Sequence, residues 1–97
     1  MRMLATAYCG RGETHGGITA QRGVAAADPR LLPLGSTVRV TGLGSRAQTY
    51  LIADTGSAVK GQHIDLFVPS CRVAKRFGRR PVRVRLLSSP RTRRDIP

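Results

Sequence analysis

The chain has 97 residues, near the lower end of the size range of domains, so it can bury one modest core and not two. We expect residues 1–97 to form one domain in which any active site is an open groove. A hydrophobic content of 40% with 23% charged residues excludes a disordered chain. The net charge of +12 predicts attraction to polyanions, and nucleic acid, anionic lipid and acidic cell-wall polymers are all candidates.

Basic residues concentrate between Arg72 and Arg94, where no acidic residue interrupts them. They form either a binding patch or a solvated basic face followed by a flexible basic tail at residues 88–97. No segment approaches the roughly 18 apolar residues of a membrane span, and residues 1–8 are too short and polar for a signal peptide. Three origins are open: a domain of a longer exported protein, a chain whose export signal is absent from this sequence, and a protein that works inside the cell.

Short apolar runs between turn signals predict β-strands along most of the chain. The runs cover residues 3–8, 23–27, 36–42, 48–54, 63–69 and 81–87. Glycine, proline or polar clusters separate them, which is typical of a small barrel or sandwich.

Two of these runs alternate between apolar and polar residues, which predicts one buried and one wet face. The residues expected to face the core are Val38, Val40, Val82, Val84 and Leu86. The residues expected to face water are Thr37, Arg39, Arg83 and Arg85. The alternation favours antiparallel strands or strands of a barrel wall.

Residues 70–78 predict a helix of about two turns, because Ser70 suits the N-cap and Gly78 suits the position after the last turn. Its apolar stripe would consist of Val73, Ala74 and Phe77. Residues 28–35 predict a further turn of helix, with Asp28 as N-cap and two prolines framing it.

The two cysteines, Cys9 and Cys71, would close a loop that the chain-entropy model values at roughly 4 kcal/mol. Their separation excludes a CxxC redox or zinc motif. The alternatives are a disulfide formed in an oxidising compartment and two unrelated buried thiols.

Two of the five acidic residues, Asp54 and Asp65, lie inside apolar runs, although burying a carboxylate is costly unless it is bonded or used. Strand alternation places Asp65 on the outer face with His63 and Phe67, where partial desolvation would raise its pKa. A carboxyl group that stays protonated near neutral pH suits general acid catalysis on a glycosidic oxygen. The alternative without a function is a strand aspartate paired with a neighbouring arginine.

The other acidic residues have structural explanations. Asp54 precedes a Thr-Gly pair, where an Asx turn accounts for it, and Asp28 before a proline suits an N-cap. The remaining two lie in a glycine-rich loop and in the tail, where solvated charge is expected. A shared function follows only if Asp28, Asp54 and Asp65 meet in space.

Metal and nucleotide sites are not predicted. The histidines have no partners at metal-ligand spacing, and Cys9 has no evident catalytic base beside it. No G-x-S-x-G motif is present, and the glycine-rich stretches lack the lysine and helix of a phosphate-binding loop. We expect no metal, no nucleotide and no other cofactor.

The chain contains, in order, ATAYC, a loop rich in glycine and threonine, GVAAADPRLLPLGSTVRV, ADTGSAVKGQHIDLF and FGRRPVRVRLL. Over residues 4–87 it resembles the three-aspartate (3D) domain of bacterial cell-wall proteins. The most specific motifs are ADP…LPLG and DTG…KG…IDLF. The resemblance implies an all-β fold, a six-stranded double-psi β-barrel with one or two short helices. The catalytic barrel of the A-type membrane-bound lytic transglycosylases shares this fold.

The resemblance also implies that Asp28, Asp54 and Asp65 converge at one end of a groove across the barrel. Asp65 matches the acid/base aspartate of the family, Asp54 a supporting carboxylate, and Asp28 a supporting or structural one. Softer matches, for contacts with sugar or peptide carboxylates, are Thr14, Lys60, His63 and Arg79 or Arg80. The two cysteines resemble those of cysteine-bearing members of the family, which favours the disulfide.

The implied chemistry is cleavage of the β-1,4 bond between N-acetylmuramic acid and N-acetylglucosamine without water, which gives 1,6-anhydromuramoyl ends. Because Asp65 would act first as acid and then as base, the carboxylate pair of ordinary glycoside hydrolases is not required. The implied partner is the glycan strand of peptidoglycan, bound outside the cytoplasm by a monomer.

Two alternatives follow from the same residues. We expect a bare barrel without the second domain that encloses glycan in the A-type enzymes, so a glycan-binding module without turnover is the first. A basic nucleic-acid-binding domain is the second. It is disfavoured by the scarcity of aromatic residues and the absence of a recognition helix.

Overall fold

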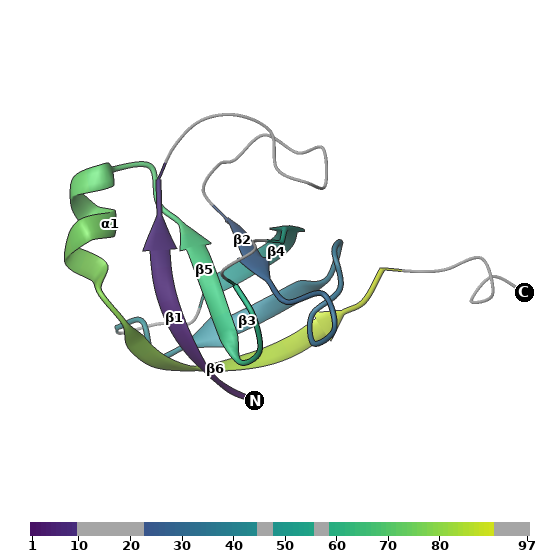
Figure 1. Cartoon of the computed structure of the whole chain (residues 1–97). Coiled ribbons are helices and arrows are strands. Elements are labelled where there is room, and N and C mark those ends of the chain that lie inside the picture. Colours follow the sequence, from purple (N-terminus) through teal and green to yellow (C-terminus); the bar gives the residue numbers. More distant parts are fainter. Residues whose placement is uncertain (10–22, 45–47, 56–58, 91–97) are drawn as a thin grey trace, which may run out of the picture.

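The structure is a computed structural model, and it describes residues 1–9, 23–44, 48–55 and 59–90. Within these residues the chain forms six strands and one helix (Figure 1). In chain order the elements are β1 (Arg2–Tyr8), β2 (Val24–Ala27), β3 (Thr37–Thr41), β4 (Gln48–Asp54), β5 (His63–Phe67), α1 (Cys71–Phe77) and β6 (Arg80–Ser88). All six predicted strands are present within about two residues of their predicted bounds.

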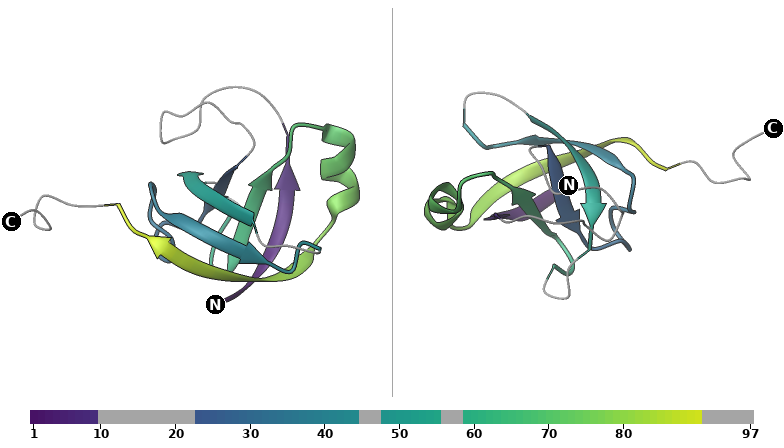
Figure 2. Two further views of the ribbon diagram at one scale, coloured as in Figure 1. Left: turned by 180° about the vertical axis from the view of Figure 1, so that it is seen from behind. Right: turned by 90° about the horizontal axis from the view of Figure 1, so that it is seen from above.

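The six strands close into a barrel in the order β1-β5-β2-β4-β3-β6. Two neighbouring pairs, β1 with β5 and β2 with β4, run parallel, and the other four pairs run antiparallel. Closure leaves no unpaired strand edge, which protects a small β protein from edge-to-edge association. The predicted all-β, six-stranded double-psi barrel is confirmed, and Figure 2 shows the ring of strands from behind and from above.

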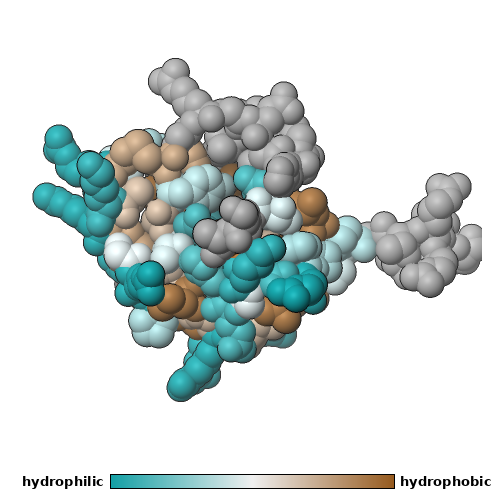
Figure 3. Space-filling model, viewed as in Figure 1, coloured by the Kyte–Doolittle hydropathy of each residue, from teal (hydrophilic) through white to brown (hydrophobic). Residues whose placement is uncertain are grey.

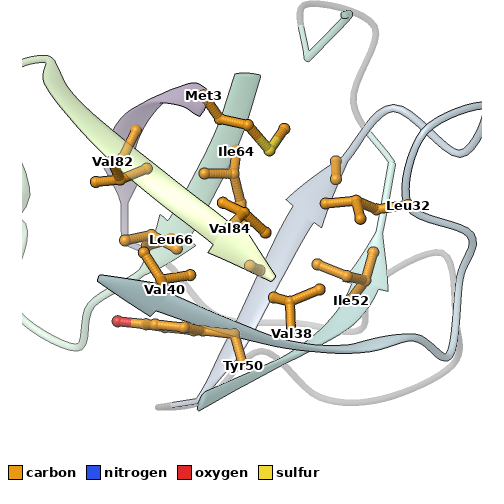
Figure 4. Close-up of a cluster of buried hydrophobic side chains, with 13 residues drawn as sticks. Met3, Leu32, Val38, Val40, Tyr50, Ile52, Ile64, Leu66, Val82 and Val84 are labelled. Carbon is orange, nitrogen blue, oxygen red and sulfur yellow. The ribbon is translucent and has the colours of Figure 1, made fainter. Parts of the chain in front are cut away.

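Apolar side chains from every strand fill the barrel (Figure 4). The predicted inward residues Val38, Val40, Val82 and Val84 are all buried. Leu86 was expected to join them, and this prediction is wrong, because its side chain is 46% exposed. The register between β3 and β6 is irregular beside Val38, the partner of Leu86, and this irregularity ends the regular inward alternation of β6.

A second, smaller apolar cluster lies outside the barrel interior. Its buried members are Val24, Ala53 and Phe67, with Tyr8 and Leu51 packed against them. These residues come from β1, β2, β4 and β5, so this side of the barrel is apolar on both faces of the wall. Phe67, expected on the outer face, is therefore buried on that face.

Helix α1 lies beside β1 on the outside of the barrel in both side views (Figures 1 and 2). Its boundaries are as predicted: the Ser70 side chain accepts a hydrogen bond from Val73 N, and Gly78 follows the last turn at φ 66°. The predicted apolar stripe is only partly buried, since Val73 is 50% exposed. The disulfide between Cys9 and Cys71 ties α1 to the end of β1 and confirms the paired alternative.

Residues 28–32 form the predicted single turn of helix, and the Asp28 side chain accepts from the nitrogen of Arg30 as an N-cap does. The nitrogens of Leu31 and Leu32 both donate to the carbonyl oxygen of Asp28, each at 2.9 Å. Pro33 follows, and because it has no N–H and would clash with the preceding turn, the helix cannot continue. The turn packs Leu32 into the core.

No helix in the described part of the chain is long and apolar enough to cross a membrane.

Candidate functional site

One row of residues crosses four neighbouring strands on the outer face of the barrel. Thr6 of β1 is the register partner of Asp65 of β5, Asp65 pairs with Ala26 of β2, and Ala26 pairs with Asp54 of β4. Since neighbouring strands lie about 4.8 Å apart, the backbones of the two aspartates are separated by roughly 10 Å. The methyl group of Ala26 is the side chain between them.

A register shift between β2 and β4 brings Asp54 into this row. Ala25 pairs with Ile52, but the next residue, Ala26, pairs with Asp54, so that Ala53 is the extra residue of a bulge. With regular pairing, Asp54 would instead lie opposite Ala27, whose side chain is in the core. The bulge therefore keeps this carboxylate out of the barrel interior, and its Oδ1 accepts a hydrogen bond of 2.8 Å from the nitrogen of Thr55.

Asp65 is half-buried and takes part in a hydrogen-bonded chain with two side chains. Thr6 Oγ1 donates to Asp65 Oδ1 at 2.8 Å, and His63 Nε2 lies 2.7 Å from the same Thr6 oxygen. A hydroxyl has a single hydrogen to donate, so while Thr6 donates to Asp65 it accepts from a protonated Nε2 of His63. Asp65 Oδ2 has no hydrogen-bond partner among the described residues.

The pKa of Asp65 is raised above its ordinary value of 3.8, mainly because burial disfavours the charged carboxylate. The hydrogen bond from Thr6 and the nearby charge of His63 act in the opposite direction and do not reverse the shift. The predicted raising of this pKa by desolvation is confirmed.

Tyr8 lies close to both aspartates. Burial raises the pKa of Tyr8 to about 12, and the charges of Asp54 and Asp65 add to the shift. Its hydroxyl is buried and has no hydrogen-bond partner among the described residues. Its ring meets Phe67 edge-on, with 5.5 Å between ring centroids. Tyr8 therefore forms an apolar wall beside the carboxylates.

Asp28, at the end of β2, has a different environment. Its carboxylate is 2% exposed and accepts four hydrogen bonds, from N, Nε and Nη2 of Arg30 and from the nitrogen of Gly61. These bonds hold the pKa of Asp28 well below its usual range, and the bond from the Arg30 side chain contributes most to this lowering. Asp28 thus fastens the 28–35 turn to the segment that leads into β5, while Asp54 and Asp65 flank Ala26.

Of the softer candidates, only His63 contacts this row in the described part of the chain. Lys60 is exposed and directly precedes Gly61. His63 is hydrogen-bonded to Thr6. Arg79 is exposed and precedes Arg80, the register partner of Ala5. Thr14 lies outside the described residues. Within the described residues, no three His, Cys, Asp or Glu side chains are grouped so that they could hold a metal ion.

The structure adds three site residues that the sequence alone did not single out: Thr6, Tyr8 and Ala26. Thr6 and Tyr8 share one face of β1 by simple alternation, which was visible in ATAYC. Their proximity to Asp65 depends on the parallel pairing of β1 with β5, which joins residues 59 positions apart. No local pattern encodes that pairing.

Known proteins with similar sequences include two from Bacillus subtilis that are named for the cell wall, the cell wall-binding protein YocH and the putative cell wall shaping protein YabE. A family model described as "3D domain" matches residues 23–88. The cell wall-binding protein YocH of Bacillus subtilis is 38% identical over 97 residues, in a match that covers 91% of this chain and 32% of YocH. YabE of the same organism is 45% identical over 65 residues, covering 67% of this chain and 15% of YabE. The chain thus spans less than a third of either relative.

Solved structures with a similar fold include those of MltA from Escherichia coli. One, described as a unique lytic transglycosylase fold, has a TM-score of 0.66 and 21% identity. MltA with bound chitohexaose has a TM-score of 0.67 and 22% identity. Each match covers 84% of this chain and 29% of MltA. At sequence identities of 21% and 22%, the structural similarity shows that this chain shares its fold with part of MltA.

Proposed function

Because the chain belongs to the 3D domain family, we propose that it cleaves peptidoglycan as a lytic transglycosylase, with Asp65 as the catalytic acid and base. The bond is the β-1,4 linkage between N-acetylmuramic acid and N-acetylglucosamine, and the product carries a 1,6-anhydromuramoyl end. The barrel it shares with MltA, described as a lytic transglycosylase, supports this choice of reaction. The relatives named for the cell wall support the choice of substrate.

The observation that carries the proposal is the half-buried position of the Asp65 carboxyl group. Burial raises its pKa, which favours the protonated form that an acid catalyst needs. Thr6 holds Oδ1, and Oδ2 has no partner among the described residues. Oδ2 is therefore the oxygen that can carry the proton toward a glycosidic oxygen.

The reaction needs only this one carboxyl group for proton transfer. Asp65 donates its proton to the glycosidic oxygen as the bond from that oxygen to C1 of the muramoyl unit breaks. The Asp65 carboxylate then takes the proton of the muramoyl C6 hydroxyl while O6 forms its bond to C1. No water is consumed, and Asp65 ends protonated as it began.

Asp54 and Thr6 support this step. Positive charge develops on the muramoyl ring as the bond breaks, and the carboxylate of Asp54, on the other side of Ala26, stabilises it. Thr6 donates to Oδ1 whether or not Oδ2 is protonated, so it fixes the orientation of the carboxyl group through both proton transfers. Lys60, Arg79 and Thr14 are proposed contacts for the sugar or for peptide carboxylates, and His63 contributes through Thr6.

The proposed place of action is outside the cytoplasm. The disulfide between Cys9 and Cys71 supports it, because disulfides form and persist in oxidising compartments.

The test is mass spectrometry of muropeptides released from purified peptidoglycan by the wild type, Asp65→Asn and Asp54→Asn. We expect anhydromuropeptides from the wild type, none above background from Asp65→Asn, and a slower release of the same products from Asp54→Asn. Cosedimentation with insoluble peptidoglycan is the control, because Asp65→Asn should still bind. Reducing ends in place of anhydro ends would mean hydrolysis and would contradict the proposal.

A glycan-binding module without turnover is the second candidate. It is favoured by the name of YocH, a cell wall-binding protein. Cosedimentation of the wild type with peptidoglycan, with no product of either kind, would establish this reading in place of the enzyme.

A further inference from the structure

Four arginines gather on the outer face of three adjacent strands, β1, β6 and β3. Arg2 is the register partner of Arg83, and Arg39 is the register partner of Arg85. All four side chains are exposed. Figure 3 shows hydrophilic side chains interspersed with hydrophobic ones along the lower part of the molecule, where β6 runs in Figure 1.

This arrangement is unfavourable for the folded protein alone. Like charges directly opposite each other on neighbouring strands repel, and here both cross-strand pairs are Arg with Arg. The described carboxylates do not relieve the repulsion: Asp28 is paired with Arg30, and Asp54 and Asp65 lie on β4 and β5. No carboxylate in the described part of the chain forms an ion pair with any of the four arginines.

Two adjoining grooves run through these arginines. One, of about 650 Å³, is lined by Arg39, Arg83 and Arg85 together with apolar side chains, Leu86 among them. The other, of about 520 Å³, shares Arg83 and Thr41 with the first and continues to Arg2. We call this continuous surface the arginine groove.

The lining of the arginine groove indicates the chemistry of its ligand. Guanidinium groups form paired hydrogen bonds with phosphate oxygens. Arg83 and Arg85 point to the same side of β6 two residues apart, so their backbones are separated by roughly 6.8 Å, a distance that suits successive groups along an extended polymer. No aromatic residue lines either groove, so stacking with nucleic acid bases has no platform here.

The groove also lies on the wall opposite the aspartates. In the closed order β1-β5-β2-β4-β3-β6, the strands β2 and β6 are three places apart and face each other across the barrel. Ala26 stands between the two aspartates on β2, and Arg83 is at the centre of the groove on β6. A polyanion in the groove would thus be attracted without meeting the carboxylates.

We infer that the arginine groove binds a linear polyol-phosphate polymer through its phosphodiester groups, independently of the aspartate row. Such a ligand supplies evenly spaced negative charges, which no carboxylate of the described residues offers the two Arg–Arg pairs, and it requires no base recognition.

The test is fluorescence anisotropy with a short, labelled synthetic poly(glycerol phosphate) as the probe, over a range of salt concentrations. The groove variant is Arg39→Gln/Arg83→Gln/Arg85→Gln, and the matched control removes the same charge from the exposed face of α1, as Arg72→Gln/Lys75→Gln/Arg76→Gln. We expect the groove variant to bind at least roughly tenfold more weakly with a shallower salt dependence, and the helix variant to lose less than about threefold. Thermal melts should show both variants folded, and single Arg85→Gln supplies a milder change if the triple variant is not.

Three results would overturn the inference. Equal weakening by both triple variants would mean that net charge alone attracts the probe. Binding of oligothymidylate of equal charge as tightly as the probe, with the same loss in the groove variant, would mean a nucleic acid site. No measurable binding of the probe at low salt would mean that the groove does not hold this polymer.

Discussion

Asp54 and Asp65 are both register partners of Ala26, one on each neighbouring strand. The two carboxylates therefore flank a single buried methyl group, and the proposed reaction would bring a sugar ring to this pair. This relationship needs both the parallel pairing of β2 with β4 and the bulge at Ala53.

A larger side chain at Ala26 should displace the proposed substrate from the two carboxylates. Ala26→Val adds two methyl groups between the carboxylates, and because Ala26 is only 5% exposed and its neighbours must shift, the stability should fall by roughly 1–3 kcal/mol. We expect muropeptide release to fall by at least roughly a hundredfold, since a displaced substrate no longer meets Oδ2 of Asp65. Ala26→Gly is the control, because it adds no atoms between the carboxylates and should remain active. Full activity of Ala26→Val would place the substrate elsewhere.

Removing the Thr6 hydroxyl should shift the pH dependence of cleavage. The Thr6 hydrogen bond lowers the pKa of Asp65, so Thr6→Val should raise that pKa further and move the high-pH limb of the rate profile to higher pH. The maximal rate should fall by about tenfold, because the carboxyl group loses its fixed orientation. Thr6→Ser keeps the hydroxyl and should leave the limb in place. A lower rate without a shifted limb would indicate only a structural role for Thr6.

Much of the barrel could be predicted from local patterns. The alternation of valine with arginine in β3 and β6 gave the correct buried faces, and Ser70 with Gly78 gave the correct ends of α1. The outward placement of Asp65 was likewise readable, because alternation within a strand is a local property. A prediction failed where the pairing with a neighbouring strand decides, as at Leu86, whose partner Val38 lies beside an irregularity in the register.

The site depends more on non-local pairing than the fold does. The bulge that aligns Asp54 with Ala26 has no signal in the run QTYLIAD, and Thr6 acquires its role only by pairing with Asp65. The resemblance singled out three aspartates and gave Asp28 a supporting or structural role. The structure adds the contacts of its carboxylate, which accepts from Arg30 and from the nitrogen of Gly61.

Asp28 should matter for stability. Asp28→Ala leaves the nitrogens of Arg30 and Gly61 without their acceptor, so we expect Tm to fall by roughly 5–10 °C, and Arg30→Gln, which spares both backbone bonds, should cost less. Because the pKa of Asp28 is lowered on folding, its contribution is complete above its ordinary value of 3.8 and is lost as the pH falls below that. The Tm difference from wild type should thus be constant from neutral pH to about pH 5 and shrink in stronger acid. A difference that persists unchanged at the lowest pH would argue against this role of the carboxylate.

The disulfide should supply a large part of the stability of so small a domain. Cys9 and Cys71 are 62 positions apart, and a loop of this length is worth about 4 kcal/mol in the chain-entropy model. Urea unfolding of Cys9→Ser/Cys71→Ser should show a loss of about that size. Reductant should destabilise the wild type to the same level and leave the double variant unchanged. If reductant breaks the Cys9–Cys71 bond of the wild type and the stability toward urea does not change, the result would contradict the expectation.

Asp65→Asn should increase the stability of the fold at neutral pH while it removes catalysis. The pKa of Asp65 is raised on folding, so below its ordinary value of 3.8 the group is protonated in both states and has no effect. As the pH rises through that value toward the higher folded pKa, the folded state holds a proton that the unfolded state has released, and wild-type stability falls. The amide of asparagine carries no charge to desolvate and can still accept from Thr6, so the variant should melt roughly 2–5 °C higher near pH 7 and equally near pH 3.

Thermal melts of the wild type and the variant, paired at each pH across this range, measure the difference in Tm. The titration of Asp28 does not affect this difference, because both proteins contain Asp28. If Asp65→Asn melted lower near pH 7, the surroundings of Asp65 would favour its charged form, and the group could not serve as the proton donor that the proposed reaction requires.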